Sequence, residues 1–225
     1  KSVDAFACSK PSTDLGPWLS VKLPCYYLVM ALRWDFSTLA DQVAKVVEHA
    51  ESDLRLEQAV YGLDSRDERE IQTMLADGLA KHHSVAREIH YPSSAGRKLT
   101  HRQRCDIVLS PAGRPLRLDS APPTLFDAPD LCTAEEALWL EVKIAYQFRE
   151  GGIRHGGYGA QWRNAVVEDL RKIEEDSLIK EAGLLLVVFN ESPEILEKDL
   201  ELFERVLMQK EVPAGFRQVR LVSIL

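Results

Sequence analysis

The sequence predicts an α/β protein in which helices flank a mixed central β-sheet. Three observations point to this fold class. Several segments carry apolar residues at helical spacing, others alternate with the period of two that is typical of strands, and residues 183–189 form an unbroken apolar run. Such a run is expected of a central strand that is covered on both faces. The chain has 225 residues, 45% of them apolar, which suffices for one large domain or two small ones.

The overall charge and hydropathy exclude several classes of protein. The net charge is −7, so bulk positive charge cannot hold the chain on nucleic acid, and any such contact needs a local basic patch. The apolar runs are much shorter than the roughly 20 residues that span a bilayer. We therefore expect no membrane partner.

The four cysteines give an expectation about the cellular compartment. Cys8, Cys25, Cys105 and Cys132 form no Cys-x-x-Cys pair, which argues against a zinc ribbon or a thioredoxin-like redox site. A chain of this size needs no disulfide support, so we expect reduced thiols in a cytoplasmic protein. The alternative is a signal peptide within residues 19–32, although a proline interrupts its apolar stretch and no small-x-small cleavage site follows.

The first 62 residues are predicted to form an N-terminal extension of the main domain, residues 63–225. Residues 1–29 show neither a helix nor a strand period, so only partial order is expected there. Apolar residues at helical spacing then predict an amphipathic helix over about residues 37–56, with Ser37 as its N-cap. This helix is expected to cover the sheet, and the alternative is that it forms the contact of a homodimer.

A helix and a hairpin follow the extension. Asp64 or Ser65 is placed to cap a second amphipathic helix. The period then changes to two, which predicts a strand over residues 85–91, a turn over residues 92–96 and a returning strand over residues 102–109. Together these segments predict a β-hairpin.

The second half of the chain completes the sheet. Residues 110–133 contain five prolines and are predicted to be a long loop. A strand over residues 138–148 and the apolar strand over residues 183–189 are separated by a glycine-rich connection and an amphipathic helix. A helix over residues 193–209 and a strand over residues 216–225 come last. The predicted core order is therefore αβββαβ, followed by a helix and a strand.

The residues with the clearest chemical potential lie on two of these strands. Asp106 is on the second strand and Glu141 and Lys143 are on the third, where alternation puts the latter two on one face. If the strands are adjacent, two carboxylates and an ammonium converge, a set that can hold Mg²⁺, with Mn²⁺ as a substitute, while the lysine orients or deprotonates water. The alternative is a structural salt bridge, because buried charges are costly unless they are paired or used.

This arrangement resembles a known family. Asp106, followed by Glu-x-Lys at residues 141–143 on the next strand of this element order, is similar to the motif of the PD-(D/E)xK nuclease superfamily, over residues 65–190. The resemblance implies a restriction-endonuclease-like fold and Mg²⁺-dependent hydrolysis of phosphodiester bonds, with DNA as the expected substrate. The sequence departs from the family pattern where Cys105 replaces the proline before the aspartate, and in the long loop between the two strands.

The resemblance also implies residue roles. Asp106 and Glu141 would bind the metal, the backbone carbonyl of Val142 would be a further ligand, and Lys143 would assist the attacking water. The alternative is a catalytically inactive member of the same fold that binds nucleic acid or a protein partner.

Two neighbouring helices supply further candidates. Family members often take another acidic ligand from the preceding helix, and the helical-wheel position of Glu68, toward the sheet, favours it over Glu70. In the helix after the third strand, Gln161 and Lys172 share one flank and resemble the polar residues that many members place near the scissile phosphate. The alternative for this pair is an ordinary solvated flank.

A local basic segment is expected to contact the substrate. Residues 87–117 hold seven basic residues against two acidic ones, and they include the hairpin that presents Asp106. DNA phosphates are therefore expected to be attracted to the site, and a merely solvated hairpin is the alternative. The candidate nucleic-acid contacts are Arg97, Lys98, Arg102, Arg104 and Lys172.

Overall fold

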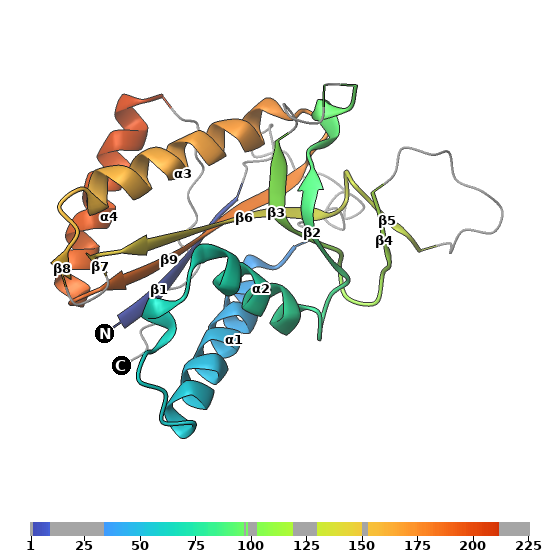
Figure 1. Ribbon diagram of the computed structural model, residues 1–225. Coiled ribbons are helices and arrows are strands. Elements are labelled where there is room, and N and C mark those ends of the chain that lie inside the picture. Colours follow the sequence, from blue (N-terminus) through green and yellow to red (C-terminus); the bar gives the residue numbers. More distant parts are fainter. Residues whose placement is uncertain are drawn as a thin grey trace, which may run out of the picture.

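The computed structural model describes residues 2–9, 34–96, 98, 103–118, 130–149 and 153–211 (Figure 1). Its centre is a mixed five-stranded sheet with helices on both faces, which confirms the predicted α/β architecture. The strands of this sheet are β1 (Ser2–Ser9), β2 (Val85–His90), β3 (Arg104–Leu109), β6 (Leu138–Tyr146) and β9 (Glu181–Asn190). The helices are α1 (Phe36–Leu56), α2 (Glu68–Leu79), α3 (Tyr158–Glu175) and α4 (Pro193–Gln209).

Several short elements connect these main ones. The predicted last strand, residues 216–225, lies outside the described residues, as does part of the long proline-rich loop. None of the described helices is both long and apolar enough to span a bilayer. The short elements are η2 (Leu63–Ser65), η3 (Pro92–Ser94), β4 (Leu116–Arg117), β5 (Cys132–Thr133), β7 (Phe148–Arg149) and β8 (Ile153–Arg154).

The strands of the central sheet follow the order β1-β9-β6-β3-β2. Only β6 and β9 are parallel, and the other neighbours are antiparallel. The strand β1 corrects an expectation, because the sequence predicted no regular element there. Ser2 pairs with Asn190 and Ser9 with Gly183. The strand therefore forms through backbone hydrogen bonds to β9, which is distant in the sequence, and its own residues need no alternation of apolar and polar side chains.

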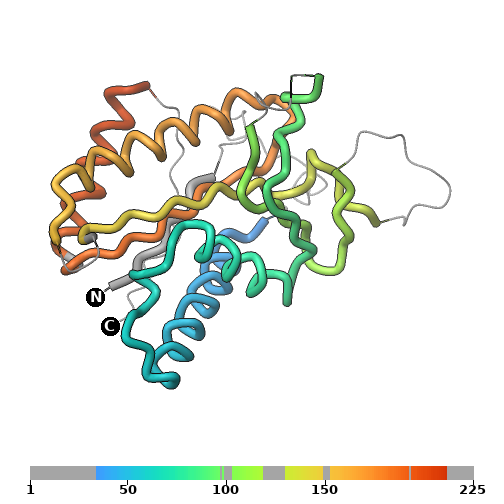
Figure 2. The backbone as a smooth tube through the Cα atoms, in the orientation of Figure 1, coloured from blue at the N-terminus to red at the C-terminus, as the bar shows by residue number. Residues whose placement is uncertain are grey.

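The helices cover the two faces of the sheet in pairs. Figures 1 and 2 show α1 and α2 on one face and α3 and α4 on the other. A hydrophobic core lies on each face of the sheet, and the apolar strand β9 contributes side chains to both. Leu185 and Val187 pack with α1 and α2, whereas Leu184 and Leu186 pack with α3 and α4. Alternation along a fully covered strand therefore explains its unbroken apolar run. The helix α1, which belongs to the predicted extension, shares its core with α2.

Both N-terminal helices begin at residues other than those predicted. Asp35 caps α1, since its carboxylate accepts hydrogen bonds from the backbone N–H groups of Ser37 and Thr38. Asp67 caps α2 in a reciprocal capping box with Glu70. The predicted caps Ser37, Asp64 and Ser65 were wrong, because these aspartates lie where the carboxylate reaches the first unpaired N–H groups.

The hairpin of β2 and β3 is present as predicted, but its pairing is interrupted. Arg87 pairs with Ile107 and Ile89 with Cys105, while Glu88 between them has a φ of 54°. A glutamate rarely adopts this left-handed conformation, and it marks a local irregularity opposite Asp106.

The pairing between β3 and β6 is short, and this positions the site. It includes Ile107 with Leu140, Val108 with Trp139 and Leu109 with Leu138. The next residues in the direction of the hairpin turn are Asp106 and Glu141. The two strands therefore separate at the two carboxylates that the sequence singled out.

Candidate active site

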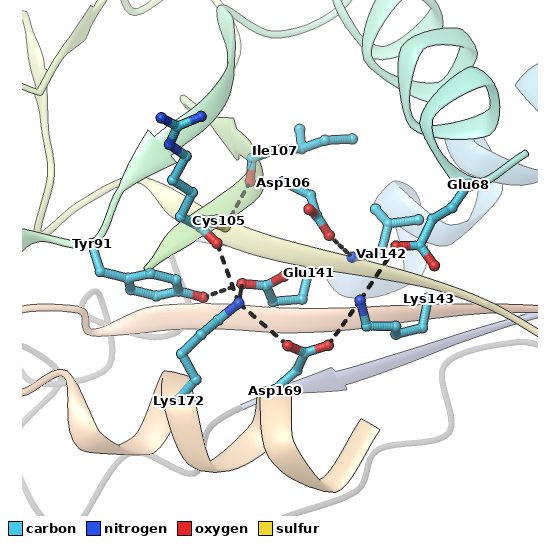
Figure 3. Close-up of polar contacts among 11 residues, drawn as sticks. Glu68, Tyr91, Cys105, Asp106, Ile107, Glu141, Val142, Lys143, Asp169 and Lys172 are labelled. Carbon is cyan, nitrogen blue, oxygen red and sulfur yellow. Dashed lines mark hydrogen bonds and ion pairs between the residues drawn. The ribbon is translucent and has the colours of Figure 1, made fainter. Parts of the chain in front are cut away.

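The candidate site lies where β3 and β6 separate, with α3 packed below and the start of α2 beside it (Figure 3). Six charged side chains gather there from four elements, and we call them the charge cluster. Its members are Glu68 on α2, Asp106 on β3, Glu141 and Lys143 on β6, and Asp169 and Lys172 on α3.

Asp106 is half-buried and bonded to the neighbouring strand. Its Oδ2 atom accepts a hydrogen bond of 2.8 Å from the backbone N–H of Val142. This contact ties the carboxylate to β6 directly beside Glu141. The predicted adjacency of Asp106 and the Glu-x-Lys triplet is therefore observed.

Glu141 is the most enclosed carboxylate of the cluster, with only 1% of its surface exposed. Its Oε1 atom accepts hydrogen bonds from Tyr91 Oη and lies 2.5 Å from both that oxygen and the Nζ atom of Lys172. Burial raises the pKa of Glu141 from 4.5 to about 8, and the charge of Asp106 adds to the rise, while Lys172 opposes it. This side chain therefore lies in a place where negative charge is costly.

Lys143 is held between the two helices that flank the sheet. Its Nζ atom lies 3.3 Å from Oε1 of Glu68 and 3.2 Å from Oδ2 of Asp169. Burial alone would lower the pKa of Lys143, but the carboxylates of Asp169 and Glu68 outweigh it and leave the pKa above its ordinary value. Lys143 is therefore an ammonium group at neutral pH.

The start of α2 presents one acidic side chain to the site. Glu68 points toward β6, as the helical wheel predicts, and burial raises its pKa although Lys143 opposes the shift. Glu70 instead completes the capping box of α2 and forms an ion pair of 2.8 Å with Arg66. The apolar stripe of the helix was enough to distinguish the two, because it fixes which side faces the sheet.

Lys172 lies inside the charge cluster. Its Nζ atom is 2.5 Å from Glu141 Oε1, 3.3 Å from Asp169 Oδ1 and 3.2 Å from the backbone carbonyl of Arg104. Its side chain is 15% exposed, so the ammonium is turned toward protein oxygen atoms. It also lies 5.2 Å from the centre of the Tyr91 ring.

Asp169 is the member of the cluster that the sequence analysis missed. It contacts both lysines, through Oδ1 to Lys172 and through Oδ2 to Lys143. The sequence did contain an indication of Asp169. This residue lies three positions before Lys172, on the flank of α3 that also carries Gln161. Residues three positions apart lie on nearly the same side of a helix. The position of Lys172 could therefore have predicted that Asp169 also faces the site.

The remaining predicted contacts lie away from the cluster or outside the described residues. Gln161 is exposed in the first turn of α3, about three helical turns or roughly 16 Å along the axis from Lys172. Arg104 forms an exposed ion pair with Glu88 at 3.8 Å, and Lys98 is exposed. Arg97 and Arg102 lie outside the described residues.

The charge cluster has more negative than positive groups. It contains four carboxylates and two ammonium groups, so the fully ionised cluster carries a net charge of −2, which one divalent cation would balance. Carboxylate oxygens are the ligands that Mg²⁺ prefers, and in this respect the donors fit that ion. Within the ranges that the structure describes, however, no three acidic, histidine or cysteine side chains are already gathered to hold a metal. Glu141 and Glu68 would have to exchange their lysine partners for it.

The arrangement is chemically suited to a phosphate ester. Carboxylates that can hold a hard cation lie next to a protonated lysine, and this combination can place positive charge on a phosphate oxygen and orient a water.

We compared the chain with family models, curated proteins and solved structures, and none of them matches it. Its function must therefore be inferred from these residues.

Proposed function

We propose that this protein is a metal-dependent nuclease of the PD-(D/E)xK kind, which hydrolyses phosphodiester bonds with DNA as its substrate. The observation that carries the proposal is the meeting of Asp106, Glu141 and Lys143 where β3 and β6 separate. Isolated charges of this kind are expensive to bury. Their gathering at a break in the sheet, next to two further carboxylates, favours a site over a chance arrangement.

The order of the elements supports a restriction-endonuclease-like fold. The elements α2, β2, β3, β6, α3 and β9 follow one another along the chain in the expected αβββαβ order, apart from the short strands. In the sheet, β2, β3, β6 and β9 lie side by side in that same order, with only the last pair parallel. This topology brings the aspartate strand beside the Glu-x-Lys strand, as the proposed fold requires.

The proposed hydrolysis divides the work among the cluster residues. Asp106, Glu141, Glu68 and the carbonyl of Val142 would hold Mg²⁺. When bound, the ion supplies Lewis-acid activation of water and phosphate. Lys143 would donate hydrogen bonds from Nζ, which lies 3.2 Å from Oδ2 of Asp169. Its role would be to orient the attacking water or a phosphate oxygen.

A cleavage assay tests the proposal. The full chain is incubated with linear duplex, circular duplex and single-stranded DNA and with RNA, in the presence of Mg²⁺ or Mn²⁺. We expect cleavage of at least one DNA form, and loss of that cleavage in Lys143→Ala and in the presence of a chelator. Cleavage of RNA alone would reassign the substrate class.

A matched lysine variant separates site chemistry from a general loss of positive charge. Lys180 is exposed and pairs with Glu135 outside the cluster, so Lys180→Ala changes the net charge as much as Lys143→Ala does. We expect Lys180→Ala to keep full activity. Equal losses in the two variants would count against a special role for Lys143.

One observation favours the second candidate, a catalytically inactive protein of the same fold that binds nucleic acid or a protein partner. Both lysines of the cluster are engaged by carboxylates within 2.5–3.3 Å, which suits a structural network. Such a protein would bind DNA in a mobility-shift assay without cutting it and would take up no divalent ion. Those two results together would replace the nuclease proposal.

A further inference from the structure

The ammonium group of Lys172 fills a cage of oxygen atoms inside the charge cluster. Three oxygens surround Nζ: Glu141 Oε1 at 2.5 Å, the Arg104 carbonyl at 3.2 Å and Asp169 Oδ1 at 3.3 Å. An ammonium has three N–H groups, so each of them has an acceptor. The aromatic face of Tyr91 lies on a further side, 5.2 Å from Nζ to the ring centre.

The contact with Glu141 leaves one carboxylate oxygen fully engaged. Oε1 receives the hydroxyl of Tyr91 as well as the ammonium of Lys172. A carboxylate oxygen has two lone pairs, so a cation can bind this atom only if one of the two donors leaves. Tyr91 is buried and stacked on Trp139. The side chain of Lys172 is flexible and partly exposed. The lysine is therefore the donor that can give way.

The same helix offers Lys172 a partner after such a displacement. Asp169 lies one turn earlier on α3 and already contacts Nζ. Lys143 differs from Lys172, because its ammonium lies against Glu68 and Asp169. Of the two cluster lysines, only Lys172 contacts Glu141, the most buried carboxylate of the site.

We propose that Lys172 is an internal counter-cation that competes with a divalent metal ion for Glu141, so that this lysine weakens metal binding in the resting protein. The inference rests on the proposed function, in which Glu141 is a metal ligand. In this arrangement the lysine occupies Oε1 of Glu141 until a metal ion arrives. It then moves toward Asp169 and leaves Glu141 to the ion.

Calorimetric titration of the full chain with MnCl₂ tests the inference without relying on cleavage. In Lys172→Met the apolar stem remains and the competing ammonium is absent, so we expect Mn²⁺ to bind at least about tenfold more tightly than to the unmodified chain. Lys180→Met, which removes an exposed lysine outside the cluster, should leave the affinity unchanged. An affinity for Lys172→Met equal to or weaker than that of the unmodified chain would overturn the inference.

A measurement on the unmodified protein covers the case in which Lys172→Met fails to fold. The ¹⁵N signal of the Lys172 ammonium is followed by NMR as Mg²⁺ is added, and we expect it to lose its hydrogen-bonded character as the ion binds. An unchanged signal at saturating Mg²⁺ would overturn the inference and leave the metal-dependent nuclease standing. Absence of Mn²⁺ and Mg²⁺ binding in every folded variant would overturn both.

Discussion

The backbone N–H of Val142 donates a hydrogen bond of 2.8 Å to the carboxylate of Asp106, beyond the point where the pairing of β3 with β6 ends. A side chain of one strand thus stands in for a backbone acceptor of that strand. The contact satisfies a buried N–H group, and it fixes the carboxylate next to Glu141. The proposed metal site and the local fold therefore share one residue.

Replacing Asp106 should expose this dual role. In Asp106→Ala the N–H of Val142 loses its acceptor, which we expect to cost about 1–3 kcal/mol of unfolding free energy. Amide hydrogen exchange, measured by NMR, should become faster at Val142, while the amides of β9 stay protected. Asp106→Asn keeps a carbonyl acceptor and should retain slow exchange. Fast exchange in both variants would show that the carboxylate charge, and not the acceptor, holds the strand.

Glu141 should make the stability of the protein depend on pH. Its pKa is raised to about 8 in the folded state, from an ordinary value of 4.5, so the folded protein holds this proton more tightly than the unfolded chain. The stabilisation is complete below pH 4.5 and is lost as the pH rises toward 8. Urea unfolding of Glu141→Gln between pH 5 and 8 should show a flatter pH dependence. The exposed variant Glu48→Gln should follow the unmodified protein, and parallel curves for Glu141→Gln would refute the prediction.

The hydroxyl of Tyr91 should contribute measurably to stability. The side chain is 2% exposed and donates to the buried Oε1 of Glu141 at 2.5 Å. Removing one partner of a buried hydrogen bond costs about 1–3 kcal/mol, so Tyr91→Phe should lower the free energy of unfolding in urea by about that amount. Tyr61 is 67% exposed, and Tyr61→Phe should change it by less than about 0.5 kcal/mol. Equal effects would mean that the buried hydroxyl is not special.

The contact between α1 and α2 requires a glycine at position 78. A Cβ atom there would lie 2.3 Å from Cγ2 and 2.6 Å from Cγ1 of Val46. Alanine favours a helix by about 1 kcal/mol over glycine, yet overpacking costs about 1–3 kcal/mol, so Gly78→Ala should destabilise the protein in thermal unfolding. In a Val46→Ala background the same substitution should become neutral or stabilising. Persistent destabilisation in that background would place the cause elsewhere.

The sequence was most informative where one helix or strand face is buried. The apolar stripe of α2 placed Glu68 correctly, and the apolar run of β9 predicted a strand covered on both faces, because burial imposes a period on the chain. The predicted neighbours Asp106 and Glu141 also lie together. For the helix stripe and the apolar strand the evidence needed was local, whereas the meeting of Asp106 with Glu141 also required their strands to be adjacent.

The sequence was least informative where distant contacts decide. The strand β1 depends on pairing with β9, nearly the whole chain away. In the sequence, Asp169 cannot be distinguished from other charged residues on the polar flank of a helix. Only the packing of α3 against the sheet places it beside Lys143. The left-handed backbone of Glu88 has no signal in its residue type, because glutamate does not favour that conformation.

The origin of the charge cluster in four separate elements has a consequence for folding. The two residues of β6, Glu141 and Lys143, leave the ribosome before α3, which carries their partners Asp169 and Lys172. The parallel strand β9 can pair with β6 only after α3 has crossed the sheet. Until then the nascent chain holds charges on an apolar strand without their partners. We therefore expect docking of α3 to supply these partners and to bury the core that α3 shares with β9 and α4.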